Sequence, residues 1–103
     1  MGNSTITRIW HGKTKAEHAD VYLKYVQDTG LSDYQAVVGN LSAKILRRVE
    51  GDICHFLTIT EWDSYASIKQ FAGEDFTKAR YYEDDRKYLL EFEERVMHYE
   101  TYR

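Results

Sequence analysis

Three histidines lie on separate stretches that alternate in the manner of β-strands: His11, His55 and His98. Imidazole nitrogens are common ligands of zinc and iron. If a sheet turned the three rings to one face, they would cluster with Glu61 or Glu100 and form a candidate metal site. The spacing matches no metal motif, and hydrogen-bonded polar residues on strands explain the three more simply. We therefore predict no metal site.

The single cysteine and the densest acidic run offer little further chemistry. Cys54 stands mid-strand among apolar residues, where a thiol usually packs without reacting. The run Glu83-Asp84-Asp85 could hold a cation, but the helix dipole already explains acidic residues at a helix N-terminus. We expect an inert thiol and a helix that begins at the acidic run.

A tryptophan at the end of a long apolar strand is the strongest candidate for a pocket residue. Residues 53–62 are rich in β-branched and aromatic side chains, which favours a strand that ends at Trp62. Side-chain oxygens of Asp63 and Ser64 can cap a following helix, which Gly73 ends. Ligand sites favour such a cleft between sheet and helix. We predict that Trp62 lines a pocket, with packing between helix and sheet as the alternative.

Both faces of the strand at 53–62 carry large apolar side chains. A sheet with one face in water would alternate apolar and polar residues, so we expect both faces to be covered. One face holds Ile53, His55, Leu57 and Ile59, and the other holds Cys54, Phe56, Thr58, Thr60 and Trp62.

Periodicity and turn residues predict the remaining elements. Thr14 and Glu17 match a capping box, and Thr29-Gly30 closes the helix that it opens. The turn at 50–52 joins two strands as a hairpin. The predicted order is a loose end at 1–5, a strand at 6–11, a helix to 30, a connection at 31–40, strands at 41–49 and 53–62, a helix to 73, helical pieces at 74–82 and from 83, and a strand at 95–102.

This order is that of a ferredoxin-like βαββαβ fold, an α+β class with a four-stranded antiparallel sheet. Crossovers of one hand place both helices on the same face and leave the other face bare. Leu57 or Phe56, and Ile9 or Trp10, must lie on the bare side in either register. Because a contiguous apolar patch usually marks an interface, we predict a homodimer whose sheets meet face to face.

Composition bounds the kind of protein. The 103 residues hold no repeat and no linker, which predicts one domain at 1–103. The net charge is −3 with acidic and basic residues interspersed, so we expect no nucleic-acid partner. No stretch is apolar enough for a membrane span and no leader opens the chain, so we expect a cytoplasmic protein. Nine tyrosines suit an aromatic pocket or interface, and equally the periphery of a small core.

Motifs over nearly the whole chain resemble those of the antibiotic biosynthesis monooxygenase domain family, whose members are dimeric α+β barrels of about this length. They look like a branch whose members are mostly uncharacterised. The resemblance implies that this domain pairs into such a barrel. It rests on Arg8-Ile9-Trp10-His11-Gly12, Gly39-Asn40, Arg47-Arg48, Gly51-Asp52, Trp62-Asp63-Ser64, Phe71-Ala72-Gly73-Glu74-Asp75, Ala79-Arg80-Tyr81-Tyr82, Asp85 and His98-Tyr99-Glu100.

Quinone-forming monooxygenases of that family suggest an activity. They use no metal or flavin, because the deprotonated form of a phenol gives electrons directly to oxygen. Such a site needs aromatic walls, a partner for the phenolate and exclusion of water. The resemblance implies that Trp62, Arg80 and Tyr81 carry out catalysis. It assigns the substrate contacts to Tyr65, Phe71, Tyr82, Trp10 and His98.

Alternatives accompany this assignment. Trp10 could belong to the dimer core, and Arg80 could form a surface ion pair with Glu83 or Asp84. The whole domain could also be a non-catalytic dimer that binds or senses a small hydrophobic ligand in the same pocket.

Haem-degrading relatives share a tryptophan at the position of Trp62 but add an asparagine in the first strand and a haem-ligating histidine on the helical segment. Here the first strand offers Thr7 and Arg8, and residues 74–82 hold no histidine. The resemblance therefore implies no cofactor, and haem would need a different ligand such as Tyr81.

Overall fold

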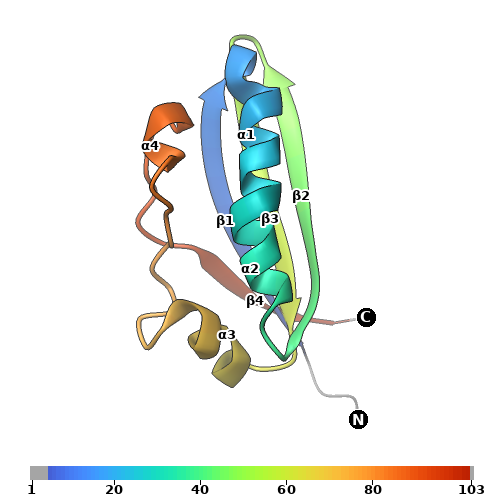
Figure 1. Ribbon diagram of the computed structural model, residues 1–103. Helices are drawn as coiled ribbons and strands as arrows, with labels where there is room; N and C mark the ends of the chain where they lie inside the picture. The colour runs from blue at the N-terminus through green and yellow to red at the C-terminus, as the bar shows by residue number, and fades with distance from the viewer. Residues whose placement is uncertain (1–4, 103) are drawn as a thin grey trace.

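A computed structural model describes residues 5–102 as a four-stranded sheet with its main helix packed along one face (Figure 1). The predicted loose end at 1–5 lies outside the described residues, apart from Thr5, which begins the first strand. No helix within 5–102 has the length and apolar composition needed to cross a membrane. The elements are β1 (Thr5–Lys15), η1 (Ala16–His18), α1 (Ala19–Val26), η2 (Gln27–Leu31), α2 (Ser32–Gln35), β2 (Asn40–Glu50), β3 (Ile53–Trp62), α3 (Tyr65–Ala72), α4 (Asp85–Tyr88) and β4 (Met97–Thr101).

The sheet is antiparallel throughout, with the strand order β2-β3-β1-β4. In the two central strands Trp10 lies opposite Thr58 and Ile9 opposite Ile59. β4 pairs only with the first part of β1, from Thr5 to Ile9. This is the ferredoxin-like βαββαβ topology, so the predicted α+β fold class is confirmed.

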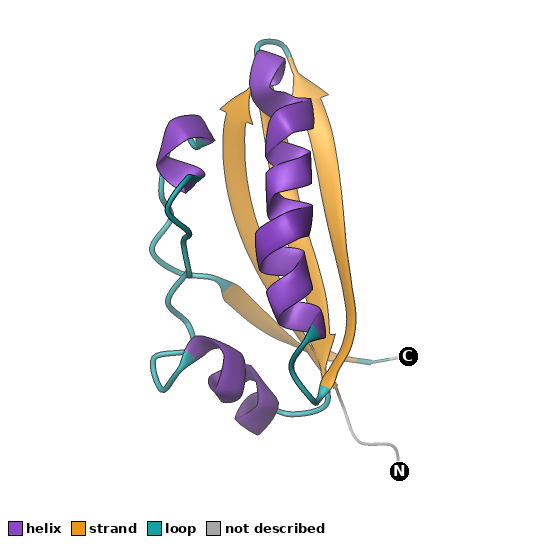
Figure 2. Cartoon of the chain, viewed as in Figure 1, coloured by secondary structure: helices purple, strands orange, loops and turns teal. Residues whose placement is uncertain are grey.

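Side chains of the central strands alternate strictly between a buried face and a half-exposed face. The helix formed by α1, η2 and α2 lies over the buried face (Figure 2). Ile9, Leu57 and Ile59 point to the opposite side, which we call the open face. The open face is the side that the sequence predicted to lack a helix, and it carries His11 and His55 as well as these apolar residues.

Two apolar clusters fill the space between sheet and helices. The first surrounds Trp10, Phe56 and Tyr22 beneath α1. The second surrounds Trp62 and Phe71 between β3, α2 and α3. The strands position both clusters, because each cluster takes its largest rings from the buried face of a central strand.

The segment after β3 forms as predicted. Ser64 caps α3 by accepting a hydrogen bond from the backbone nitrogen of Ser67 at 3.2 Å. Gly73 follows the last helical residue with φ of 86°, a backbone conformation that costs glycine little and other residues more. The strand at 53–62 has its predicted bounds.

Three predicted boundaries near the N-terminus are wrong, because long-range pairing overrides the local signals. β1 continues past Gly12 to Lys15, since β3 supplies pairing partners along this whole length. Thr14 is therefore buried in a strand and does not cap a helix. The first helix also does not end at Gly30 but continues through η2, one stretch of π-helix, into α2.

Residues 74–82 form no helix, contrary to prediction. Their backbone groups find partners elsewhere, since the nitrogen of Ala79 donates to the carbonyl of Glu94 at 2.8 Å. Further along, the nitrogen of Leu90 donates to the carbonyl of Lys13 at 2.9 Å. Residues 89–90 therefore lie along the part of β1 that β4 does not reach, and residues 74–82 pair instead with the chain just before β4.

Candidate functional site

A small cavity lies between the buried face of the sheet and the helix formed by α1, η2 and α2. Its volume is about 30 Å³, which suits a group of carboxylate size or a few waters. Aromatic rings, two arginines and one carboxylate line it. The lining side chains that carry a charge or an aromatic ring are Arg8, Trp10, Tyr22, Tyr34, Arg80, Tyr82 and Asp85.

Arg8 reaches the cavity from the middle of β1 and is 2 % exposed. Among residues 5–102, neither its Nε nor its Nη2 has a hydrogen-bond partner. Its guanidinium carbon lies 5.4 Å from the centroid of the Phe71 ring. Burial lowers the pKa of Arg8 from its ordinary value; Tyr34 opposes this shift, and the charge of Arg80 adds to it. Because arginine remains protonated in proteins, a cation with two unpaired nitrogens faces the cavity.

Arg80 reaches the same cavity from the segment that follows α3. Its Nη1 donates to the carbonyl oxygen of Phe71 at 3.1 Å, and its guanidinium carbon lies 4.9 Å from the centroid of that ring. Its carboxylate neighbour is Asp33, at 3.8 Å, and not Glu83 or Asp84. The pair is half-exposed and weak. Arg80 is therefore held by the backbone and the ring of Phe71 more than by a counter-charge.

Asp85 is the buried carboxylate of the cavity. It accepts hydrogen bonds from the Tyr22 hydroxyl at 2.8 Å and from the backbone nitrogen of Tyr82 at 2.6 Å. Burial raises the pKa of Asp85. Burial, together with Asp85, also raises the pKa of Tyr22, while burial and a hydrogen bond to Asp33 raise the pKa of Tyr82. Both phenols therefore stay protonated donors near neutral pH, and Asp85 is an acceptor.

Trp62, the predicted pocket wall, does not line this cavity. Its side chain is fully buried, and its indole nitrogen donates to Thr60 Oγ1 at 2.8 Å. The rings of Tyr34 and Phe71 pack against it, with centroids 6.4 and 6.0 Å away. Trp62 thus lies where the packing alternative placed it, one layer behind the cavity, and Phe71 lies between it and the two arginines.

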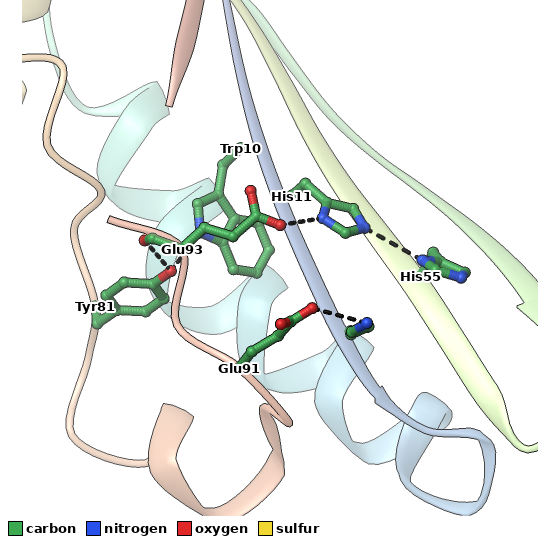
Figure 3. A network of polar contacts seen from close by, with 7 residues as sticks. Trp10, His11, His55, Tyr81, Glu91 and Glu93 are labelled. Atoms are coloured by element: carbon green, nitrogen blue, oxygen red, sulfur yellow. Dashed lines mark hydrogen bonds and ion pairs between the residues drawn. The ribbon is translucent and has the colours of Figure 1, made fainter. Parts of the chain in front are cut away.

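Two more of the predicted site residues, Tyr81 and Trp10, contact one another. The Tyr81 hydroxyl donates to the carbonyl of Glu93 at 2.6 Å and accepts from the Trp10 indole nitrogen at 3.5 Å (Figure 3). Trp10 lines the cavity, whereas Tyr81 lies outside it. Tyr81 is therefore placed to orient Trp10.

His98 and Tyr65 lie on the side of Arg8 away from the cavity lining. His98 stands opposite Arg8 on β4, and its ring packs between Tyr65 and Phe76. Burial, and then the charge of Arg8, lowers the pKa of His98 to about 4. His98 is therefore neutral at pH 7 and does not add to the positive charge beside Arg8.

Of the seven charged or aromatic lining residues named above, sequence reasoning missed four: Arg8, Tyr22, Tyr34 and Asp85. A signal existed for Arg8, which lies between Ile6 and Trp10 on a face destined for burial, where an unpaired charge is rare. The other three carry no local signal, because only the packing of α1, α2 and residues 80–85 brings them together.

On the open face, His11 and His55 belong to a row of polar contacts (Figure 3). His11 Nδ1 pairs with Glu93, His11 Nε2 lies 3.2 Å from His55 Nδ1, and His55 Nε2 lies 3.0 Å from Glu50. If all three contacts are hydrogen bonds, three of the four ring nitrogens carry hydrogen. His98 points to the other face, so the three-histidine cluster does not form. Within 5–102, no group of three or more metal-ligating side chains is placed to hold a metal.

Comparisons with known proteins show the fold. No protein-family model and no curated protein matches the sequence. The structure of PA3566 from Pseudomonas aeruginosa matches with a TM-score of 0.60 at 16 % identity, covering 98 % of this chain and 95 % of that one. The structure of a proposed antibiotic biosynthesis monooxygenase from Nitrosomonas europaea matches with a TM-score of 0.62 at 13 % identity, covering 98 % of this chain and 92 % of that one. The structure of another proposed antibiotic biosynthesis monooxygenase, from Bacillus cereus, matches with a TM-score of 0.61 at 12 % identity, covering 97 % of this chain and 94 % of that one. At such identities the likeness supports a shared fold and no activity.

Proposed function

We propose that the protein is an oxygen-using enzyme of the monooxygenase type that acts on a small aromatic molecule with an acidic hydroxyl. The observation that carries this proposal is the composition of the cavity, where Arg80 and Asp85 share a lining with aromatic rings. A base and a cation at one cavity suit the removal of a proton from a phenol. The monooxygenase names of two structures with this fold agree with the proposal.

In this proposal Asp85 accepts the proton of the substrate hydroxyl. Its raised pKa makes it a better base than an exposed carboxylate, and the bonds from Tyr22 and the backbone of Tyr82 hold it in place. Arg80 stabilises the resulting phenolate, and the surrounding rings exclude water. The phenolate then transfers electrons to oxygen. One oxygen atom enters the substrate and the other leaves as water, with two substrate hydrogens, so the substrate itself is the reductant.

The size of the cavity limits what enters it. About 30 Å³ takes a reacting group but not a whole ring, since ligand sites usually measure about 300–1,000 Å³. A substrate ring therefore requires the covering helix to move. The π-helical stretch η2 carries Thr29 over the cavity, and such stretches are frequent at functional sites. We propose that opening occurs at η2.

The residues present do not fit haem. Tyr81, the candidate ligand, uses its hydroxyl to donate to the carbonyl of Glu93. The cavity is also far smaller than a macrocycle. We assign no step to haem. Hemin added to the protein should give no saturable shift of the Soret band, and such a shift would contradict this assignment.

Oxygen uptake with a panel of monocyclic and polycyclic phenols tests the activity. The wild-type protein should consume oxygen with at least one of them. Arg80→Met and Asp85→Asn should each lower kcat/KM by roughly 100-fold or more, the usual contribution of a positioned acid, base or charge. Arg86→Met, at an exposed arginine of α4, is the matched control and should leave uptake unchanged.

Two outcomes would contradict the proposal in different ways. Uptake that both cavity variants retain would place the chemistry elsewhere. No uptake with any phenol would favour the second candidate, a non-catalytic protein that binds a small hydrophobic ligand in the same cavity. Equilibrium binding of the same phenols, followed by tryptophan fluorescence, identifies that second case because Trp10 lines the cavity.

We also propose that the open face pairs with the open face of a second copy. Ile9, Leu57 and Ile59 are only half-buried there, and Leu46 and Met97 are 43 % and 58 % exposed. An exposed apolar area on a sheet favours association. Sedimentation velocity at micromolar concentration should give a dimer, and Leu57→Lys should shift it toward monomer. A monomeric wild-type protein would refute the pairing.

A further inference from the structure

Arg8 is the most deeply buried charged residue of the cavity, at 2 % exposure against 4 % for Asp85. Its Nε and Nη2 lack hydrogen-bond partners among residues 5–102. A buried cation without a partner is strongly destabilising, and most buried polar groups in native proteins are satisfied. The Tyr34 hydroxyl is a polar neighbour of the guanidinium, but it carries no counter-charge at neutral pH. Arg8 therefore needs a partner for Nε and Nη2 that the described side chains do not provide.

The carboxylates nearest the cavity are already engaged by other groups. Asp33 accepts from the Tyr82 hydroxyl at 2.5 Å and lies 3.8 Å from Arg80. Asp85 accepts from the Tyr22 hydroxyl and from the backbone nitrogen of Tyr82. No ion pair within 5–102 involves Arg8. Arg8 consequently presents to the cavity a positive charge that no carboxylate within 5–102 pairs with.

The two unpaired nitrogens are adjacent. Nε and Nη2 form one edge of the guanidinium, and their two hydrogens point in parallel, which matches the two oxygens of a carboxylate. The cavity of about 30 Å³ has the size of such a group. Arg80 lines the same cavity and adds a second positive charge. A neutral ligand would leave the charge of Arg8 uncompensated and would lack the second oxygen that matches the two donors.

We propose that Arg8 binds a carboxylate group of the ligand through Nε and Nη2. This inference rests on the proposed function for its choice of cavity and narrows the substrate to an aromatic carboxylate that carries a hydroxyl. The carboxylate end lies at Arg8, which leaves the hydroxyl to Arg80 and Asp85. Arg8 is the residue that sets ligand class, because a ligand without the negative charge leaves the buried cation unpaired.

Binding of sodium benzoate tests this inference without any turnover. Benzamide, which has the same shape without the charge, is the matched ligand, and sodium chloride keeps the ionic strength constant. Tryptophan fluorescence should show saturable benzoate binding to the wild-type protein and at least about tenfold weaker benzamide binding, a factor worth about 1.4 kcal/mol. Arg8→Met should weaken benzoate binding at least about tenfold, and Arg86→Met should bind as the wild type does.

A second readout keeps the test valid if Arg8→Met does not fold. In the wild-type protein, the Nε–H resonance of Arg8 in a nitrogen-15 spectrum should shift with benzoate and not with benzamide. Arg8→Lys, which keeps the charge but loses the paired donors, should bind benzoate more weakly than the wild type.

Each contrary result has one meaning. Three results would overturn the inference: no saturable binding of benzoate to the wild-type protein, equal affinity for benzoate and benzamide, or an Arg8→Met variant that binds benzoate as tightly as the wild type. Oxygen uptake from simple phenols without benzoate binding would contradict this inference and leave the proposed function standing. Benzoate binding without uptake from any hydroxybenzoate would support this inference and contradict the proposed function.

Discussion

Replacement of Arg8 by methionine should make the protein without ligand more stable. Methionine keeps an unbranched apolar stem, although it is shorter than arginine, and it has no polar group that needs a partner. Each unsatisfied buried polar group costs about 1–3 kcal/mol, and Arg8 has two unpaired nitrogens. Against this gain stands the loss of the cation–π contact with Phe71, which is worth about 0.5–2 kcal/mol. The shorter side chain also leaves a void, which reduces the gain. We therefore expect a net gain of about 1–3 kcal/mol.

Urea denaturation followed by circular dichroism measures this change, in a buffer without carboxylate anions. The midpoint should rise with an unchanged slope, and the melting temperature should rise by about 4–8 °C per kcal/mol in a domain of this size. Arg8→Lys retains a buried cation and should show no gain. A methionine variant that is less stable than the wild type by about 1 kcal/mol or more would show that Arg8 is satisfied, and would refute the reasoning on which the carboxylate site depends.

Three further predictions concern stability, each read from urea midpoints. The pKa of His98 is lowered to about 4 in the folded protein against about 6.5 in the unfolded chain, so the free energy of unfolding should fall as pH drops from about 6.5 to 4. The fall is at most about 3 kcal/mol before solvent screening. His98→Gln should flatten this pH dependence, and an unchanged slope in that variant would contradict the prediction. A Cβ at Gly12 would lie 2.6 Å from Trp10 Cζ2, so Gly12→Ala should lower the free energy of unfolding by about 1–3 kcal/mol. The control is Gly51→Asn, at a position with φ of 60° and open space around it, which should change the free energy of unfolding by less than about 1 kcal/mol. Tyr22→Phe removes a donor to Asp85 and should cost about 1–3 kcal/mol; a change within about 0.5 kcal/mol would show that this bond is replaced by water.

Local patterns were sufficient for the parts of the chain whose neighbours are close in sequence. Alternation gave the bounds of β3 and its two faces, and the cap at Ser64 and the glycine at Gly73 gave those of α3. The order of elements then indicated the ferredoxin-like topology, because few connections of a four-stranded antiparallel sheet satisfy the rules of handedness. The same topology predicted an open face, because it places both helices on one side of the sheet.

Local signals failed where distant pairing competed with them. Gly12 breaks a strand in isolation, but β3 offers a pairing partner through Lys15, so the strand continues. Residues 74–82 have helix-forming composition, but their backbone bonds with the segment before β4 replace a helix.

The site shows the same division. The sequence alone determined that Arg8 and Trp10 share a face, since side chains of a strand alternate with a period of two. It also marked Arg80 and Tyr82 as candidates, and both line the cavity. Only the tertiary structure decided that Trp62 lies behind the cavity, that Asp85 meets Tyr22 and that Arg8 is left without a counter-charge. Those facts depend on which distant groups occupy one small volume, and burial and pairing of charge are properties of that volume and not of any single stretch of chain.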